Sequence, residues 1–167
     1  MRRILIIGNS GAGKSTLARR LGERLDLPVI HLDALFWKPG WTESDDSEFR
    51  VRVADALSGP AWVCDGDFGS SLDLRMPLAD TIIWLDPPPI LCLARAIWRA
   101  IKFADGGRPD MAEGCREKID LTFYGYIWNW NRTRRPRVEA ALAGHGDHLG
   151  VIKLRTDRDV AAFLAEA

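Results

Sequence analysis

The feature that most constrains this chain is a glycine-rich stretch close to its first residue. Residues 8–15 read Gly-Asn-Ser-Gly-Ala-Gly-Lys-Ser and match the pattern Gly-x-x-x-x-Gly-Lys-Ser/Thr at every specified position. The stretch follows an apolar run at 4–7 and leads into residues 15–25, whose apolar side chains have helical spacing. A strand, a tight turn and a helix in this order aim backbone N–H groups and a helix amino terminus at one point. The sequence therefore predicts a binding site for nucleotide phosphates.

The positions of this turn have separate expected roles. Glycine lets the backbone approach a ligand and take positive φ. Lys14 can reach the β- and γ-phosphates of ATP, and the Ser15 hydroxyl can bind Mg²⁺. ATP and Mg²⁺ are therefore the expected cofactors. The residues expected to contact the nucleotide are Gly8, Asn9, Ser10, Gly11, Ala12, Gly13, Lys14, Ser15 and Thr16.

The rest of the chain alternates short apolar runs with helical patterns, which is typical of a parallel α/β sheet. The expected strands are residues 3–8, 29–32, 61–64, 81–85 and 149–154. Right-handed crossovers predict helices on both faces of this sheet. The length of 167 residues suits one domain, 1–167. An aromatic-rich irregular loop is expected at 34–47, followed by a helix at 45–57.

Composition and charge exclude several other classes of protein. Hydrophobic residues make up 47% of the chain and charged residues 28%, as in globular proteins rather than disordered ones. No apolar run approaches the roughly 20 residues that cross a membrane, and no signal peptide is expected. Three widely spaced cysteines favour a reducing cytoplasm. The net charge is zero, so nucleic acid is not a favoured partner.

Three carboxylates follow expected strands, at the edge of the sheet where α/β proteins bind ligands. These are Asp33, Asp65 and Asp86. Mg²⁺ usually needs an acidic residue besides the hydroxyl of the turn, and we expect Asp65 to join Ser15 in that role. Asp33 and Asp86 are alternatives, and a carboxylate at such a position can also cap a helix or a turn.

The glycine-rich turn, the Asp65-Gly66 strand end and the turn at 85–88 resemble adenylate-kinase-type small-molecule kinases. The resemblance implies a three-layer P-loop NTPase fold. Its five-stranded parallel sheet would have the order 2-3-1-4-5, with an acceptor-side insert at about 34–58 and a helical lid at about 104–118. Two further stretches, 31–41 and 108–115, resemble adenylate-kinase-related proteins named topology modulation proteins, a name that suggests DNA supercoiling without defining a reaction.

The same resemblance implies roles for several arginines. Arg95 would pack on the adenine, and Arg99, which shares its helix face, would contact the transferred phosphate. Arg108, in the expected lid, would reach over the phosphates. The turn that contains Arg158 resembles the adenine-side loop of adenylate kinases, although an ordinary helix cap explains it equally well.

The part that would bind a phosphate acceptor departs from adenylate kinases. After Asp65-Gly66 those proteins continue with Phe-Pro-Arg, whereas here the nearest arginine is Arg75, which we expect to serve the acceptor. In shikimate- and gluconate-kinase-like proteins, an aspartate after the second strand meets an acceptor hydroxyl, and that resemblance assigns the role to Asp33. Phe36 and Trp37 can stack on a flat acceptor, or they can simply pack in the core.

The sequence thus predicts Mg²⁺- and ATP-dependent phosphoryl transfer to a nucleotide, a nucleoside or a hydroxylated metabolite. The expected catalytic residues are Lys14, Asp33, Arg99 and Arg108. Two alternatives stay open: a nucleotide-binding ATPase or regulator that acts with DNA, and an ATP sensor without turnover. The expected assembly is a monomer or a homodimer.

Overall fold

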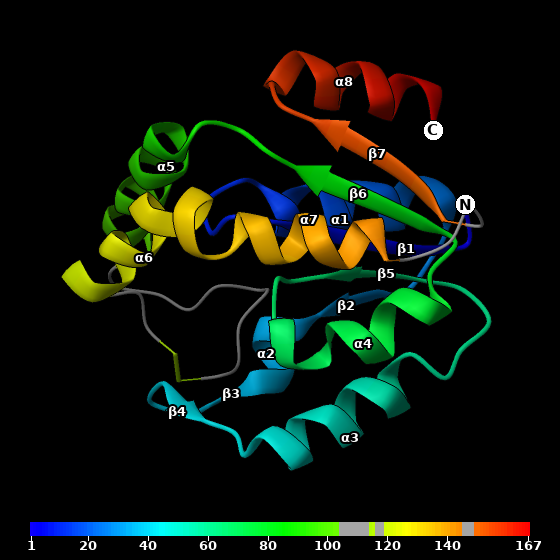
Figure 1. The fold of residues 1–167 in the computed structure, drawn as a ribbon, viewed down its shortest axis with the longest axis horizontal. Coiled ribbons are helices and arrows are strands. Elements are labelled where there is room, and N and C mark those ends of the chain that lie inside the picture. Colours follow the sequence, from blue (N-terminus) through cyan, green and yellow to red (C-terminus); the bar gives the residue numbers. More distant parts are fainter. Residues whose placement is uncertain (104–113, 116–118, 145–148) are drawn as a thin grey trace.

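The computed structural model describes residues 1–103, 114–115, 119–144 and 149–167. Its main sheet has five parallel strands. Their spatial order is β2 (Val29–His31), β5 (Trp62–Asp65), β1 (Arg3–Gly8), β6 (Thr81–Leu85) and β7 (Gly150–Leu154). Counted along the chain within this sheet, the order is 2-3-1-4-5, as predicted. Figure 1 shows β6 and β7 side by side, both ending toward α5 and α6.

The central strand β1 explains why its sequence is apolar without alternation. Successive side chains of a strand point to opposite faces of the sheet. Leu5 and Ile7 therefore belong to one core, and Ile4 and Ile6 to the other. A strand covered on both faces in this way needs apolar side chains at every position.

Helices cover both faces, which confirms the three-layer α/β fold. One face is covered by α1 (Lys14–Leu25), α5 (Pro89–Lys102) and α8 (Asp157–Glu166). The other face is covered by α3 (Asp46–Ala56), α4 (Leu72–Arg75), η2 (Met76–Leu78) and α7 (Arg135–Ala143). Helix α6 (Leu121–Thr133) contributes Ile127 to one core and Trp130 to the other. In Figure 1, α7 crosses in front of the sheet and α1 lies behind it.

The segment after β2 differs from the irregular loop expected at 34–47. It forms helix α2 (Leu32–Phe36) and a hairpin of β3 (Trp37–Lys38) and β4 (Thr42–Glu43). Gly40 and Trp41 take positive φ, 76° and 63°, in the hairpin turn. The Ser44 N–H closes the hairpin by donating to the Phe36 carbonyl at 3.1 Å. The next helix, α3, agrees with the one predicted at 45–57 to within two residues.

The hairpin also contacts the described part of the expected lid. The Cys115 thiol donates to the Lys38 carbonyl at 3.3 Å, and a Cβ on Gly114 would meet Pro39 at 3.3 Å. Most of the segment 104–118, including Arg108, lies outside the described residues.

A short 3-10 helix, η1 (Gly69–Ser71), connects the end of β5 to α4.

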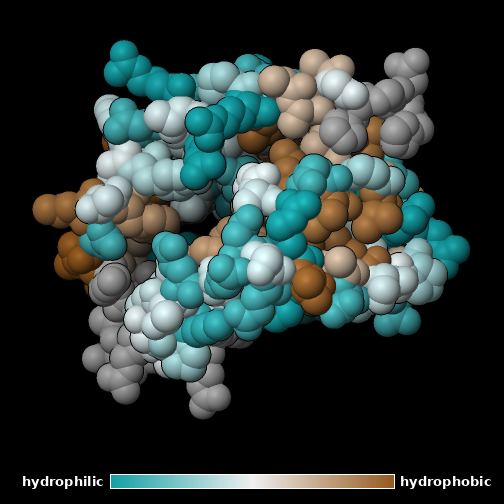
Figure 2. Space-filling view, turned by 60° about the horizontal axis from the view of Figure 1, so that its bottom comes forward, coloured by the Kyte–Doolittle hydropathy of each residue, from teal (hydrophilic) through white to brown (hydrophobic). Residues whose placement is uncertain are grey.

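Exposed hydrophobic side chains are concentrated on α5 and α6. Figure 2 shows them gathered at the end of the molecule where these two helices lie in Figure 1. Trp98 is 59% exposed and Ile101 68%, both on α5, and Leu121 at the start of α6 is 80% exposed. In the part of the chain that the structure describes, no helix has the length and apolarity needed to cross a membrane.

Candidate active site

The turn between β1 and α1 has the backbone conformation that its glycines allow. Gly8, Gly11 and Gly13 have φ of 141°, 82° and 100°. A Cβ at Gly8 or Gly11 would lie 2.2 Å from the carbonyl oxygen of Leu85 or Cys92, respectively. A Cβ at Gly13 would meet nothing within 4 Å. The turn is therefore packed tightly against β6 and α5 and is open at the amino end of α1, where a phosphate can approach.

Side chains hold this turn in place. Lys14 Nζ donates to the carbonyl oxygens of Gly8 and Asn9 at 2.9 and 3.0 Å. Asn9 is 3% exposed, and its Nδ2 donates to the Ile127 carbonyl of α6 at 2.9 Å. The Asn9 side chain thus anchors the turn, and only its backbone can serve a nucleotide. The Lys14 ammonium already lies within the turn, close to the expected phosphates.

The two expected Mg²⁺ ligands lie together. Ser15 Oγ donates to Asp65 Oδ2 at 2.7 Å, and Asp65 is 4% exposed. Hydroxyl and carboxylate oxygens are the hard donors that Mg²⁺ prefers, so the pair fits this ion. Within the described residues, no group of three or more His, Cys, Asp or Glu side chains could hold a metal. Phosphate and water oxygens would complete the coordination, as they usually do for Mg²⁺.

His31 lies on the other side of Asp65. Its Nδ1 is 2.5 Å from Asp65 Oδ1, and the two residues are in register on β2 and β5. Both oxygens of the Asp65 carboxylate therefore have protein partners. This fixes the orientation of the group that faces Ser15.

The other two strand-end carboxylates have different surroundings. Asp86 lies 3.2 Å from Arg135, 3.1 Å from Lys153 and 3.9 Å from Arg155, and its side chain is 6% exposed. These cations give Asp86 a structural role at the ends of β6 and β7. Asp33 lies in the first turn of α2, half-buried, and its charge contributes to raising the pKa of Tyr126.

Asp67 lies beside this site, although no sequence motif pointed to it. Trp130 Nε1 donates to Asp67 Oδ2 at 3.3 Å, and the Tyr126 hydroxyl lies near this carboxylate. Burial raises the pKa of Asp67, while the charge of Lys14 opposes this rise. Burial, followed by the charge of Asp67, raises the pKa of Tyr126 to about 12. A second carboxylate two residues after Asp65 was the signal that could have identified it.

Arg75 does not have the setting expected of an acceptor ligand. Arg75 is 0% exposed, and burial lowers the pKa of its guanidinium. The guanidinium donates to the carbonyl oxygens of Gly66 at 3.0 Å, Phe68 at 2.6 Å and Ser71 at 3.3 Å. The N–H groups with which Arg75 would bind a phosphate acceptor are thus used by backbone carbonyls. Arg75 therefore stabilises the segment 66–71 that follows β5.

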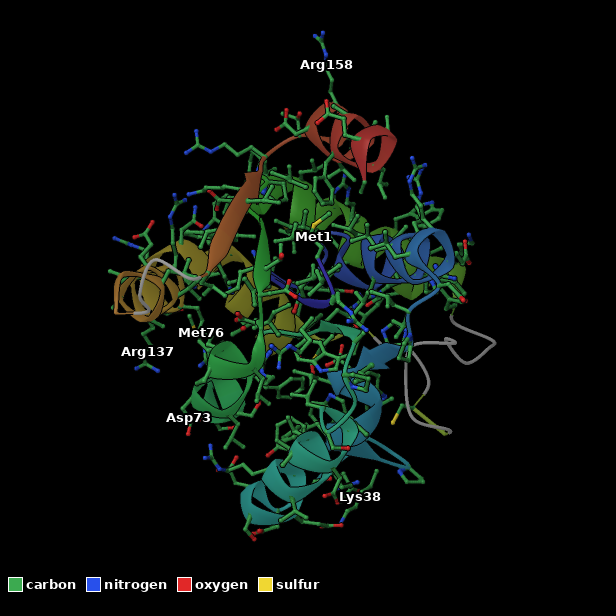
Figure 3. The ribbon with its side chains drawn as sticks, turned by 90° about the vertical axis from the view of Figure 1, so that its right-hand side faces the viewer. Met1, Lys38, Asp73, Met76, Arg137 and Arg158 are labelled. Atoms are coloured by element: carbon green, nitrogen blue, oxygen red, sulfur yellow. The ribbon has the colours of Figure 1, made fainter. Side chains whose placement is uncertain are left out.

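The arginines expected at the nucleotide differ in their positions. Arg95 Nη2 donates to both carboxylate oxygens of Asp157, at 2.7 and 2.8 Å, and Arg95 Nη1 lies 3.5 Å from the Ala12 carbonyl of the turn. Arg99 follows one turn later on α5 and is half-buried. Arg158 is exposed and points away from the body of the molecule (Figure 3), so the structure does not bring it to the turn.

The aromatic residues after β2 pack mainly against one another. The Phe36 ring lies 5.1 Å from that of Phe49 and 4.7 Å from that of Phe68, at the edge of the core. The Trp37 ring lies 5.0 Å from Phe36 and 5.3 Å from Trp41. Phe36 therefore packs at the edge of the core, which was the second of the two roles considered for it. Trp37 is half-buried beside Phe36.

Comparisons with known proteins agree with this description of the fold. A family model described as an AAA domain matches residues 4–58, which include the turn, α1 and β2. The chain resembles a shikimate kinase from Acinetobacter baumannii in complex with shikimate, with 16% identity and a TM-score of 0.58. It equally resembles a gluconokinase from Sinorhizobium meliloti 1021, with 18% identity and a TM-score of 0.58.

These likenesses extend over the whole chain. Each alignment covers 99% of this chain, together with 90% of the shikimate kinase and 92% of the gluconokinase. The chain therefore shares the fold of these two proteins. No curated protein matches it in sequence. The resemblance to topology modulation proteins stays a prediction, because neither the family model nor these two structures bears that name.

Proposed function

We propose that the chain transfers the γ-phosphoryl group of ATP to the hydroxyl of a small molecule and that it needs Mg²⁺. The observation that carries this proposal is the 2.7 Å contact between Ser15 and Asp65, beside the open amino end of α1. It joins a metal-binding pair to a phosphate-binding turn. The shared fold of shikimate kinase and gluconokinase supports transfer to a small molecule rather than to a protein.

The residues of the turn would position and neutralise the phosphates. Lys14 would exchange its two carbonyl partners for the β- and γ-phosphate oxygens, and the N–H groups at the start of α1 would donate to the same oxygens. Mg²⁺ held by Ser15 and Asp65 would neutralise the charge that develops between these phosphates. Arg95 would border the adenine, and Arg99 would contact the transferred group.

The acceptor would lie between the end of β5 and the start of α2. The charges of Asp33 and Asp67 both raise the pKa of Tyr126, so both carboxylates lie near this hydroxyl. In that region Asp33 would orient the attacking hydroxyl and accept its proton. Asp67, held by Trp130, would accept a second hydroxyl of the acceptor. Such an arrangement suits a nucleoside, a nucleotide or a hydroxylated metabolite.

Acceptor-dependent formation of ADP tests this proposal. ATP and Mg²⁺ are supplied with nucleoside monophosphates, nucleosides and hydroxylated acids and sugars. We expect one class to raise ADP release well above the rate without acceptor. Lys14→Ala should abolish this increase, whereas Lys38→Ala, which removes an exposed lysine paired with Glu48, should retain it.

Other results would support the alternative functions. ATP binding with no acceptor-dependent ADP release would overturn the kinase proposal and favour a nucleotide sensor. An increase of ADP release by supercoiled DNA alone would instead favour an ATPase that acts with DNA. The same assay, with supercoiled plasmid added as one arm, therefore distinguishes all three.

A further inference from the structure

A groove separates α4 and η2 from α7 on the sheet face opposite α1. Its volume is about 420 Å³. Its floor is apolar, since Met76 and Val138 are buried in the core and Leu72 packs beside them. Figure 3 shows Arg137 extending from α7 along the side where Met76 and Asp73 lie. We call this feature the α4–α7 groove.

The charges around the α4–α7 groove do not balance. Asp73 is already paired, because its two oxygens accept hydrogen bonds from Arg50 at 2.9 and 2.8 Å. Arg137 is exposed and has no hydrogen bond or ion pair from its side chain within the residues that the structure describes. Arg134 reaches across the inner end, where its Nη1 would lie 3.7 Å from a Cβ on Gly69. With Asp73 paired, the lining has two arginines, Arg134 and Arg137, and one further carboxylate, Asp67, so the groove carries excess positive charge.

The inner end of the groove adjoins the active site. Asp67 lines the groove and follows Asp65 by two residues, and Asp65 accepts a hydrogen bond from Ser15 of α1 at 2.7 Å. Asp67 is held at this inner end by Trp130, whose Nε1 donates to Oδ2 at 3.3 Å. A molecule with one end at Asp67 would place its other end between Arg134 and Arg137.

We infer that the α4–α7 groove binds the distal part of the phosphate acceptor, and that this part carries a carboxylate or phosphate beside an apolar portion. Guanidinium groups bind both anions through paired hydrogen bonds, and the apolar floor favours hydrocarbon over a polyol. No carboxylate among the described residues pairs with Arg137, so an anionic acceptor would supply its counter-charge. The inference rests on the proposed function, which supplies the acceptor, but the binding site can be tested without turnover.

Methionine methyl NMR offers a direct test, because the chain has only three methionines. In protein labelled with ¹³C at the methionine methyl groups, Met76→Leu assigns the signal from the groove floor. Mandelate, phenyl phosphate and mandelamide are then titrated as two anions and one neutral analogue with the same ring. We expect mandelate or phenyl phosphate to shift the Met76 signal with an affinity at least about tenfold higher than that of mandelamide.

Two arginine variants make this test specific. Arg137→Leu should abolish the preference for the anions, while Arg158→Leu, which removes an arginine pointing away from the body, should preserve it. The inference is overturned if the anions and mandelamide shift the Met76 signal equally, if none of them shifts it, or if Arg137→Leu retains the preference. Which of the two anions binds more tightly decides between a carboxylate and a phosphate.

Steady-state kinetics of the Arg137→Leu variant test the groove separately from the proposed kinase activity. For an acceptor found by ADP release, Arg137→Leu should raise the acceptor KM about tenfold and leave kcat and the KM of ATP unchanged. Anion-selective binding without any acceptor-dependent ADP release would refute the kinase proposal and retain the groove as an anion site. Acceptor-dependent ADP release without anion-selective binding would retain the kinase and refute the groove.

Discussion

His31 holds Asp65 from the neighbouring strand, with 2.5 Å between Nδ1 and Oδ1. The opposite carboxylate oxygen of Asp65 accepts a hydrogen bond from Ser15 at 2.7 Å. Three elements, β2, β5 and α1, therefore meet at one carboxylate that is 4% exposed. Rotation of the Asp65 carboxylate would break both contacts, so His31 acts as a positioning residue for the proposed metal site.

His31→Ala should weaken the binding of Mg²⁺ to the nucleotide complex by about tenfold, because Asp65 loses the group that orients it. Binding of ATP without Mg²⁺ should stay unchanged. Calorimetric titrations with and without Mg²⁺ measure both quantities. His31→Asn keeps an N–H donor near the position of Nδ1 and should recover much of the loss. Equal Mg²⁺ affinity in wild type and His31→Ala would show that the contact only stabilises the fold.

Asp33→Asn should lower kcat for the active acceptor by about 100-fold, since an amide cannot accept the proton of the attacking hydroxyl. The KM of ATP should change little, because Asp33 lies in α2 and the nucleotide turn follows β1. Steady-state kinetics with both substrates varied give these values. Asp46→Asn, an exposed carboxylate at the start of α3, serves as the control. An unchanged kcat in Asp33→Asn would assign proton transfer to another group.

Arg75→Met should destabilise the fold by about 3 kcal/mol, because it leaves buried carbonyl acceptors of Gly66 and Phe68 without donors. Urea unfolding measures the free energy. Arg50→Met is the matched control: it breaks a surface pair with Asp73, and exposed pairs contribute little to stability. If Arg75→Met were as stable as wild type but lost acceptor affinity, the sequence-based assignment of Arg75 to the acceptor would be restored.

The strands and the phosphate-binding turn could be predicted because their signals are local. Unbroken apolar runs mark buried strands, and the spacing from Gly8 to Ser15 requires the turn. The hairpin at 37–43 was missed because its strands have only two residues each, too short for an alternating pattern. The composition around Pro39 and Gly40 also reads as an irregular loop.

The settings of Arg75 and Asp67 could not be predicted from local pattern. An arginine in the segment between two expected strands indicates an exposed cation, and only the path of 66–71 shows that backbone carbonyls surround it. Asp67 acquires its role from Tyr126 and Trp130, which follow it by about sixty residues in the chain. Such contacts depend on how α6 packs across the end of the sheet.

Two glycines of the turn should respond differently to the same substitution. Gly13→Ala should cost about 1 kcal/mol of stability from its positive φ alone, since its Cβ meets no protein atom. Gly11→Ala adds a collision with the Cys92 carbonyl and should cost about 3 kcal/mol. Gly13→Ala should still lose ATP affinity, because its Cβ enters the open side of the turn. Unfolding curves and ATP titrations check both; equal stability losses would contradict the packing described here.

The helix cap at the start of α8 predicts a pH-dependent contribution to stability. Asp159 Oδ2 accepts hydrogen bonds from the Arg155 and Thr156 N–H groups, both at 2.9 Å, and these hold the pKa of Asp159 below its usual value. A carboxylate whose pKa is lowered by folding stabilises the native state above its unfolded pKa, near 4. That contribution disappears as the pH falls through the lower, folded pKa.

Asp159→Asn should therefore be less stable than wild type at pH 6, and the difference should shrink toward pH 3. Thermal unfolding at a series of pH values measures it. Thr156→Ala removes the non-titrating hydroxyl of the same capping box, which accepts from the Asp159 N–H at 3.1 Å. Its deficit should persist at pH 3, because the backbone donor loses its partner at every pH. A stability difference for Asp159→Asn that is constant from pH 6 to pH 3 would mean that the Asp159 charge contributes nothing to the cap.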